Sequence, residues 1–169
     1  MDSDTSKPGK HYKAPWSTLL LVVTSSVTVL LLGLTLGLFL CGQGIAQWAG
    51  LLPLAILICS IPFTIRGYSV MSDTLVVHRL FWTTRLPLSG LKSAEFEPGA
   101  MRGSIRTFGN GGLYSITGFF YNKALGAYRA FVTDHHQTVV LHFSGRTVVV
   151  SPSSPEEFVH DICVASRVA

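Results

Sequence analysis

Residues 14–65 read APWSTLLLVVTSSVTVLLLGLTLGLFLCGQGIAQWAGLLPLAILICSIPFTI and contain no Asp, Glu, Lys, Arg or His. The hydrocarbon core of a bilayer is roughly 30 Å thick, so a helix needs about 20 apolar residues to cross it. The stretch is long enough for two such helices and a short turn, and it is too long for one. The sequence therefore predicts a transmembrane helical hairpin over residues 14–65.

The two helices are predicted over residues 17–40 and 48–63, with a short uncharged turn between them. Gly33 and Gly37 in the first helix stand four residues apart, a spacing that lets another helix approach closely. Their partner is either the second helix or another copy of the chain. The hydroxyl groups inside the first helix, including that of Thr24, are expected to bond back to their own helix.

A cleaved signal peptide is the alternative interpretation of the first apolar segment. The apolar run over residues 19–40 is longer than the core of a usual signal peptide. The bulky residues 38–40 before Cys41 fit neither a small-residue cleavage site nor a lipid-attachment motif. We therefore expect the segment to remain as an anchor.

The basic residues at the ends of the hairpin predict its orientation. Lys7, Lys10 and Lys13 precede the first helix and Arg66 follows the second, whereas the turn carries no positive charge. The positive-inside rule then places both termini in the cytoplasm. Residues 1–13 are polar and are predicted to form a disordered tail.

Residues 66–169 are predicted to form one mainly-β domain. Short β-rich runs are separated by turn residues, and a Gly-dense segment spans residues 103–126. Ser144-Gly145 suits a two-residue hairpin turn. The pattern SPEE at residues 154–157 resembles a capping box with proline at the first helical position, which predicts a helix from about residue 155. We expect about seven antiparallel strands followed by one C-terminal helix.

This order of elements resembles that of a pleckstrin-homology-like (PH-like) domain. The segment IRTFGNGGL at residues 105–113 is similar to the hallmark of the bacterial PH domain family, and the similarity extends over roughly residues 66–162. The resemblance implies a barrel or sandwich of two roughly orthogonal antiparallel sheets, with the helix closing one open end. It constrains function weakly, because PH-like folds serve lipid binding, peptide binding and oligomer assembly.

The Gly-rich segment carries the candidate binding site. The candidate residues are Arg102, Arg106, Asn110, Gly111, Gly112, Lys123 and Arg129. Backbone N–H groups of successive glycines can surround an anion, and arginines can grip phosphate or carboxylate with two hydrogen bonds. The alternative interpretation, which we favour, is an irregular loop with solvated arginines and with Asn110 bonded to its own backbone.

Composition and spacing argue against other functions. A net charge of +4 is too small to indicate nucleic-acid binding. The scattered cysteines and the adjacent His135 and His136 make no metal-ligand spacing. No nucleophile stands in a recognisable catalytic pattern, so we predict no catalytic residue, cofactor or metal, and no enzyme activity.

The sequence as a whole predicts a two-pass protein of the bacterial cytoplasmic (inner) membrane that holds a non-catalytic binding or scaffold domain at the cytoplasmic face. The predicted partners are the lipid bilayer and either a membrane protein or a second copy of the chain. Only residues 65–67 separate the second helix from the first strand, which keeps the domain close to the bilayer. The alternative function is recognition of an anionic lipid headgroup or small anion by the basic Gly-rich loop, residues 102–129.

Overall fold

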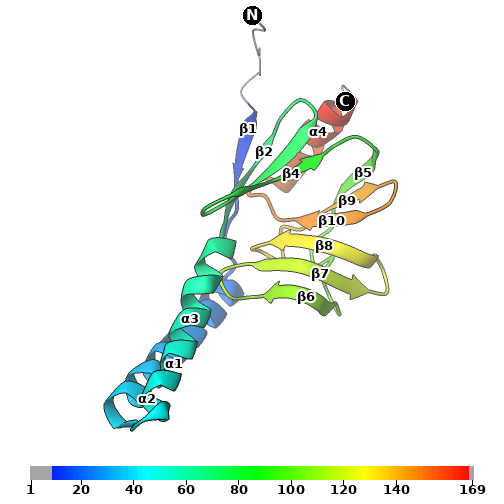
Figure 1. The fold of residues 1–169 in the computed structure, drawn as a ribbon. Helices are drawn as coiled ribbons and strands as arrows, with labels where there is room; N and C mark the ends of the chain where they lie inside the picture. The colour runs from blue at the N-terminus through cyan, green and yellow to red at the C-terminus, as the bar shows by residue number, and fades with distance from the viewer. Residues whose placement is uncertain (1–8, 168–169) are drawn as a thin grey trace, which may run out of the picture.

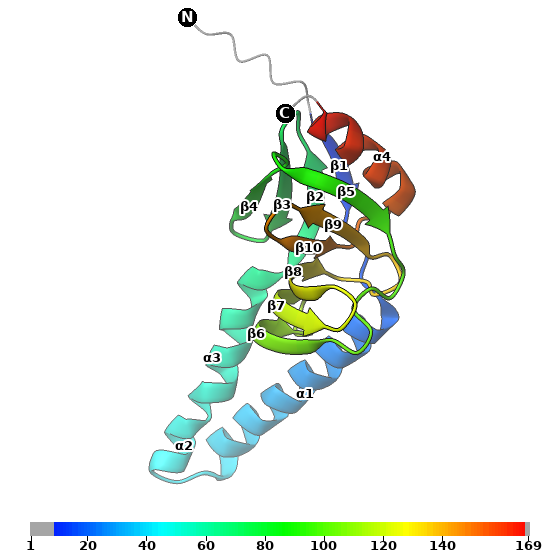
Figure 2. The ribbon, with the colours of Figure 1, turned by 90° about the vertical axis from the view of Figure 1, so that its right-hand side faces the viewer.

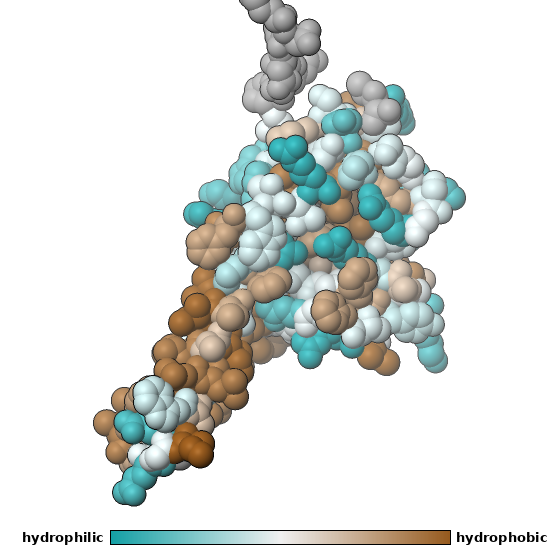
Figure 3. Space-filling view, viewed as in Figure 1, coloured by the Kyte–Doolittle hydropathy of each residue, from teal (hydrophilic) through white to brown (hydrophobic). Residues whose placement is uncertain are grey.

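The computed structural model describes residues 9–167, and it consists of a helical arm and a β-rich domain (Figure 1). The arm contains α1 (Thr18–Cys41), α2 (Ile45–Ala49), α3 (Leu51–Ser60) and the 3₁₀ helix η1 (Ile61–Phe63). α3 packs alongside α1, and the two run side by side away from the domain (Figures 1 and 2). The surface of the arm is almost continuously apolar (Figure 3).

Among the described helices, α1 alone has the length and composition of a membrane span. Its 24 residues give about 36 Å at 1.5 Å per residue. The predicted second helix, 48–63, is instead divided into α2, α3 and η1. Gly50 lies between α2 and α3, and glycine has a low helix propensity. Pro62, which lacks an N–H, lies in the 3₁₀ turn at the end.

Gly33 and Gly37 do not mediate the contact between α1 and α3. A methyl group added at either position would meet no neighbouring atom within 4 Å. Of the two predicted partners for these glycines, the second helix is therefore the wrong one. Packing against another copy of the chain stays a prediction.

The domain contains two β-sheets whose strands run across one another (Figure 1). The four-stranded sheet has the order β1-β2-β3-β4 and the six-stranded sheet the order β5-β9-β10-β8-β7-β6. The strands are β1 (Lys10–Lys13), β2 (Ile65–Val70), β3 (Thr74–Arg79), β4 (Thr83–Pro87), β5 (Leu91–Phe96), β6 (Ile105–Gly111), β7 (Ile116–Asn122), β8 (Gly126–Val132), β9 (Val139–Phe143) and β10 (Thr147–Val150). The prediction of antiparallel pairing throughout is wrong at one place, since β8 and β10 pair in parallel.

β1 lies within the segment predicted as a disordered tail. Residues 10–13 pair with β2, so this part of the prediction is wrong; residues 1–8 lie outside the described residues. Three features hold β1 in place. The Tyr12 side chain is buried, and Lys10 forms an ion pair with Glu157 of the C-terminal helix. Gly67, which has no side chain, leaves space for the ring of His11. A Cβ atom at Gly67 would lie 2.6 Å from that ring.

The Gly-dense segment 103–126 forms two paired strands, β6 and β7, and not an irregular loop. Gly109 and Gly118 are partners in the register. A Cβ atom at Gly109 would lie 2.4 Å from the Thr117 carbonyl oxygen, and one at Gly118 would lie 2.1 Å from that of Phe108. The two backbones approach so closely that only glycine fits at this crossing.

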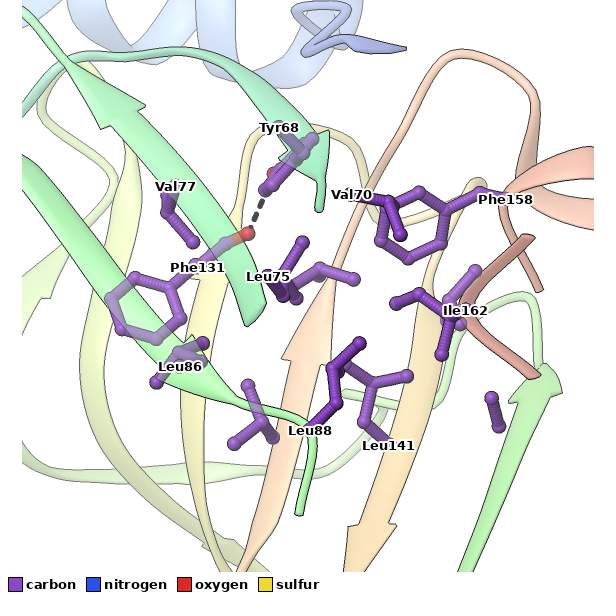
Figure 4. Packing of buried hydrophobic residues seen from close by; sticks show 14 of the residues in the cluster. Tyr68, Val70, Leu75, Val77, Leu86, Leu88, Phe131, Leu141, Phe158 and Ile162 are labelled. Atoms are coloured by element: carbon purple, nitrogen blue, oxygen red, sulfur yellow. Dashed lines mark hydrogen bonds between the residues drawn. The ribbon is translucent and has the colours of Figure 1, made fainter. Parts of the chain in front are cut away.

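The main core lies between the sheets and is closed on one side by α4 (Pro155–Ser166). Phe158 and Ile162 of α4 are completely buried there, on the side of the cluster opposite Phe131 (Figure 4). Pro155 begins the helix as predicted, but the predicted capping box does not form, since the Ser154 side chain makes no capping hydrogen bond. A second core covers the other face of the six-stranded sheet, beneath residues 97–104.

The domain is joined directly to the helical arm. One residue, Thr64, separates η1 from β2, and the Ser115 hydroxyl donates to the Phe63 carbonyl over 2.8 Å. The Thr24 hydroxyl donates to the Gly112 carbonyl and accepts from the Tyr114 N–H, each over 3.2 Å. The expectation that Thr24 bonds back to its own helix is therefore wrong, because the turn between β6 and β7 docks on α1.

Candidate binding groove

A groove of about 570 Å³ is lined mostly by β7, β8 and β10 of the six-stranded sheet, with Leu86 of β4 contributing from the other sheet. Its lining is mostly apolar, with two arginines. The lining residues are Leu86, Thr107, Phe119, Phe120, Tyr121, Ala127, Tyr128, Arg129, Gly145, Arg146, Thr147 and Val148. A cavity of this size is within the range that binds small molecules or side chains of a partner.

The wall of the groove formed by β7 continues onto an exposed aromatic face. We define this face by Ile105, Phe108, Phe119 and Tyr121. Phe108 pairs in register with Phe119, and Ile105 with Tyr121. Phe108 is 76% exposed and Ile105 is 68% exposed. β6 is also the edge of the sheet, so it offers free backbone groups beside exposed apolar side chains.

Two guanidinium groups lie along the groove. The Cζ atom of Arg129 is 4.8 Å from the ring centroid of Phe131, and that of Arg146 is 4.8 Å from the ring centroid of Phe143. No acidic residue is among the groove's lining. The ion pairs found within residues 9–167 involve Lys10 or His160 and neither of these arginines. The groove therefore combines apolar walls with unneutralised positive charge.

The predicted anion-binding residues do not converge on one concavity. Arg129 lines the groove, whereas Arg102 lines a separate hollow beside His135 and His136. Arg106 lies on exposed β6 with its guanidinium against Gly111, and Lys123 is exposed in the turn between β7 and β8.

Asn110 and Gly112 hold the turn between β6 and β7 to itself and to α1. The Asn110 Oδ1 accepts from the Leu113 N–H over 3.1 Å and from the Gly112 N–H over 3.3 Å. The Gly112 carbonyl is occupied by the Thr24 hydroxyl. These contacts account for the turn without a ligand, and a role of its residues in anion binding stays a prediction.

Sequence reasoning missed Leu86 and Arg146 as parts of a site. Arg146 follows a hairpin turn, where an arginine is commonly solvated, and it meets the groove because β10 lies beside β8. This parallel pairing joins two strands that are not consecutive in the chain. No local sequence pattern predicts such a pairing.

Comparison with protein-family models matches residues 66–165 to the bacterial PH domain. The chain belongs to the bacterial PH domain family. The match confirms the resemblance drawn from residues 105–113, and the two sheets with a C-terminal helix agree with a PH-like architecture. Bacterial PH domain membership supports a non-catalytic binding module in general terms. Comparisons with curated proteins and with solved structures give no match.

Proposed function

We propose that this bacterial PH domain protein is a two-pass inner-membrane protein whose cytoplasmic domain binds a protein partner. The pairing of β1 with β2 is the main support for the proposed membrane topology. These strands flank the helical arm in sequence and meet in one sheet, so both ends of the arm lie on the same side of a bilayer. An even number of crossings follows if α1 spans the membrane.

The second half of the arm is long enough to complete the return. Residues 45–63 give about 28 Å at 1.5 Å per residue, close to the roughly 30 Å of a hydrocarbon core. The loop at Gln43 would then face the outside, and Ser153, which is exposed before α4, would face the cytoplasm.

Cysteine labelling tests this topology. In a variant with Cys41, Cys59 and Cys163 replaced by serine, Gln43→Cys should react with a membrane-impermeant maleimide in intact spheroplasts. Ser153→Cys should react only after the membrane is permeabilised. Labelling of both positions in intact spheroplasts, or of Ser153→Cys alone, would contradict the proposed topology.

The aromatic face and the groove support a protein partner over a small anion. The candidate basic residues are dispersed, whereas exposed apolar side chains gather on β6 and β7 (Figure 3). β6 and β7 also lie near the domain end of the arm in both ribbon views (Figures 1 and 2). We therefore assign the partner as a membrane protein that presents an apolar segment next to its own membrane span, with an acidic residue opposite Arg146.

Site-specific photocross-linking in native membranes tests the partner. A photoreactive phenylalanine at Tyr121, on the wall of the groove, should give one discrete adduct that mass spectrometry maps to such a segment. Lys92, exposed on β5 at the opposite edge of the same sheet, is the matched control position. Arg146→Glu should reduce the adduct. Lipid adducts alone, or the same band from Lys92, would overturn the assignment, and a dimer of the chain would identify the partner as a second copy.

A further inference from the structure

Two histidines from different strands meet at one serine hydroxyl on the four-stranded sheet. The His11 Nδ1 atom lies 3.1 Å from the Ser69 Oγ atom, and the His78 Nε2 atom lies 2.8 Å from the same oxygen. The ring centroids of His11 and His78 are 5.5 Å apart. The three residues come from β1, β2 and β3, so their contacts connect the outer strand β1 to the two strands beside it.

The hydrogen bonds at Ser69 suit two neutral rings. A neutral imidazole has one N–H group and one free nitrogen, so the Ser69 hydroxyl can donate to one ring and accept from the other. A protonated imidazole has two N–H groups and no acceptor. Protonation of both His11 and His78 therefore removes the acceptor of the Ser69 O–H and places two positive charges beside each other.

The charged side chains on the same face of the sheet are basic. Cross-strand partners share a face, so the register places Lys13 and Arg85 on the face that carries the two histidines. Asp73 is the nearest acid to His78 along the chain, and the length of β3 between them separates the two by roughly 16 Å. Burial lowers the pKa of His78, and the charge of His11 lowers it further.

The remaining charged groups of these strands and of α4 lie elsewhere. They are Lys10, Arg66, Arg79, Glu156, Glu157, His160 and Asp161. Side chains alternate along β1, so Lys10 points away from His11 and pairs with Glu157 and Asp161 of α4. Arg66 is exposed at the bulge of β2, and Arg79 lies over three aromatic rings. In β1–β4 and α4, no acid is therefore placed to stabilise a protonated pair of histidines.

β1 is attached by one strand pairing and by its contacts with α4. As the outer strand of its sheet, it can separate from β2 without breaking any other strand pairing. Its contact with α4 does not titrate near neutral pH. The Tyr12 hydroxyl lowers the pKa of Asp161 below 3.8, and burial raises the pKa of Tyr12 to about 12. The two histidines are therefore the part of this attachment that responds to mild acid.

We propose that His11, Ser69 and His78 form a pH-sensitive contact that releases β1 from β2 more often in mildly acidic conditions. Release separates the two rings and exposes His78 to water, so the released form binds protons more readily than the attached form. The attachment is complete above the ordinary histidine value of 6.5 and weakens as the pH falls below it. Release also leaves β2 as the open edge of the sheet, where another strand can pair. The inference concerns β1 alone and does not depend on the proposed partner.

Hydrogen–deuterium exchange of the full chain in nonionic detergent tests this contact. Peptides that cover residues 9–14 report the opening of β1, after correction for the intrinsic pH dependence of exchange. The opening equilibrium should rise by about three- to tenfold between about pH 7.5 and pH 5.5, as expected for like charges that repel near a protein surface. Peptides that cover β10, inside the six-stranded sheet, should show no such rise.

His11→Gln and His78→Gln keep a polar side chain without a titrating charge, and each should abolish the rise. His142→Gln changes a histidine on β9 of the other sheet and is the matched control, which should keep the rise. Near-ultraviolet circular dichroism at both pH values checks that each variant is folded. No rise in the native chain, or a rise that survives in either variant of the pair, would overturn the proposal. An equal rise in β10 would also overturn it, because the whole domain would then be loosening.

Discussion

The two sides of the core between the sheets differ in whether their charged residues have partners of opposite charge. On the side of α4, Phe158 and Ile162 are fully buried, and the charged residues nearby are paired, as Lys10 is with Glu157 and Asp161. On the side of Phe131, two arginines lie over aromatic rings without acidic partners. A protein gains stability from the first arrangement and gains little from the second. The difference indicates that α4 contributes more to the stability of the domain than the two arginines do.

Removing the ring of Phe158 should have the largest effect on stability. Phe158→Ala leaves a cavity in the main core and should lower the free energy of unfolding by about 3–5 kcal/mol. Chemical denaturation of the full chain in nonionic detergent, followed by near-ultraviolet circular dichroism, measures the change. Val164→Ala changes a residue on α4 that is 52% exposed and should alter stability little. Equal losses in the two variants would contradict the assigned role of Phe158.

The hydroxyl of Tyr68 should have the next largest effect. It donates to the Phe131 carbonyl over 2.7 Å and accepts from the Ser151 N–H over 3.3 Å, in a fully buried position. Burial raises the pKa of Tyr68 to about 12. Tyr68→Phe leaves two buried polar groups without this partner and should cost about 1–3 kcal/mol in the same assay. Tyr121→Phe on the exposed aromatic face is the control, and a comparable loss there would refute the argument.

Asp161 should make stability depend on pH on the α4 side. The Tyr12 hydroxyl, which donates to Asp161 over 2.6 Å, and then Lys10 lower the pKa of its carboxyl below the ordinary 3.8. The unfolded chain therefore binds the proton more readily, so stability from this group is complete above pH 3.8 and is lost as the pH falls through the lower folded-state value.

Asp161→Asn should lower the free energy of unfolding by about 0.5–1 kcal/mol at neutral pH, because the pair is largely at the surface. Its deficit relative to the native chain should shrink on acidification below pH 3.8. Denaturation at a series of pH values measures both curves. A deficit that stayed constant across that range would show that the carboxylate charge does not matter.

Replacing Arg79 should have the smallest effect and completes the comparison. Arg79→Met removes favourable contacts with three rings and also removes a buried charge that Arg129 repels. These contributions oppose each other, so the free energy of unfolding should change by less than about 1 kcal/mol. A loss as large as that of Phe158→Ala would mean that Arg79 is structural, and that the two sides of the core do not differ as described.

Local patterns predicted much of the domain. Ser144-Gly145 marked the hairpin of β9 and β10, Pro155 marked the start of α4, and the Gly-rich segment carried the family resemblance. Each of these features depends on residues close together in sequence. The glycines at 109 and 118 were visible, but the close approach that requires them exists only once β6 and β7 are paired.

The features that could not be predicted depend on contacts between distant segments. β1 has the sequence KHYK, which carries no strand pattern, and it forms because β2 lies beside it. Arg79 and Arg129 meet at Phe131 because the end of one sheet packs over the other. Thr24 faces Gly112 because the domain docks on α1. The contacts of these side chains could not be predicted from the sequence, because they depend on how the two sheets and the arm are arranged.

The position of β1 imposes an order on how the molecule is made. This strand leaves the ribosome before α1, and its partner β2 emerges only after η1 is complete. The four-stranded sheet therefore gains its outer strand late, when a loop of more than fifty residues closes. Correct placement of the apolar arm thus becomes a condition for finishing the domain, and a chain whose arm is misplaced would be left with β2 as an open edge.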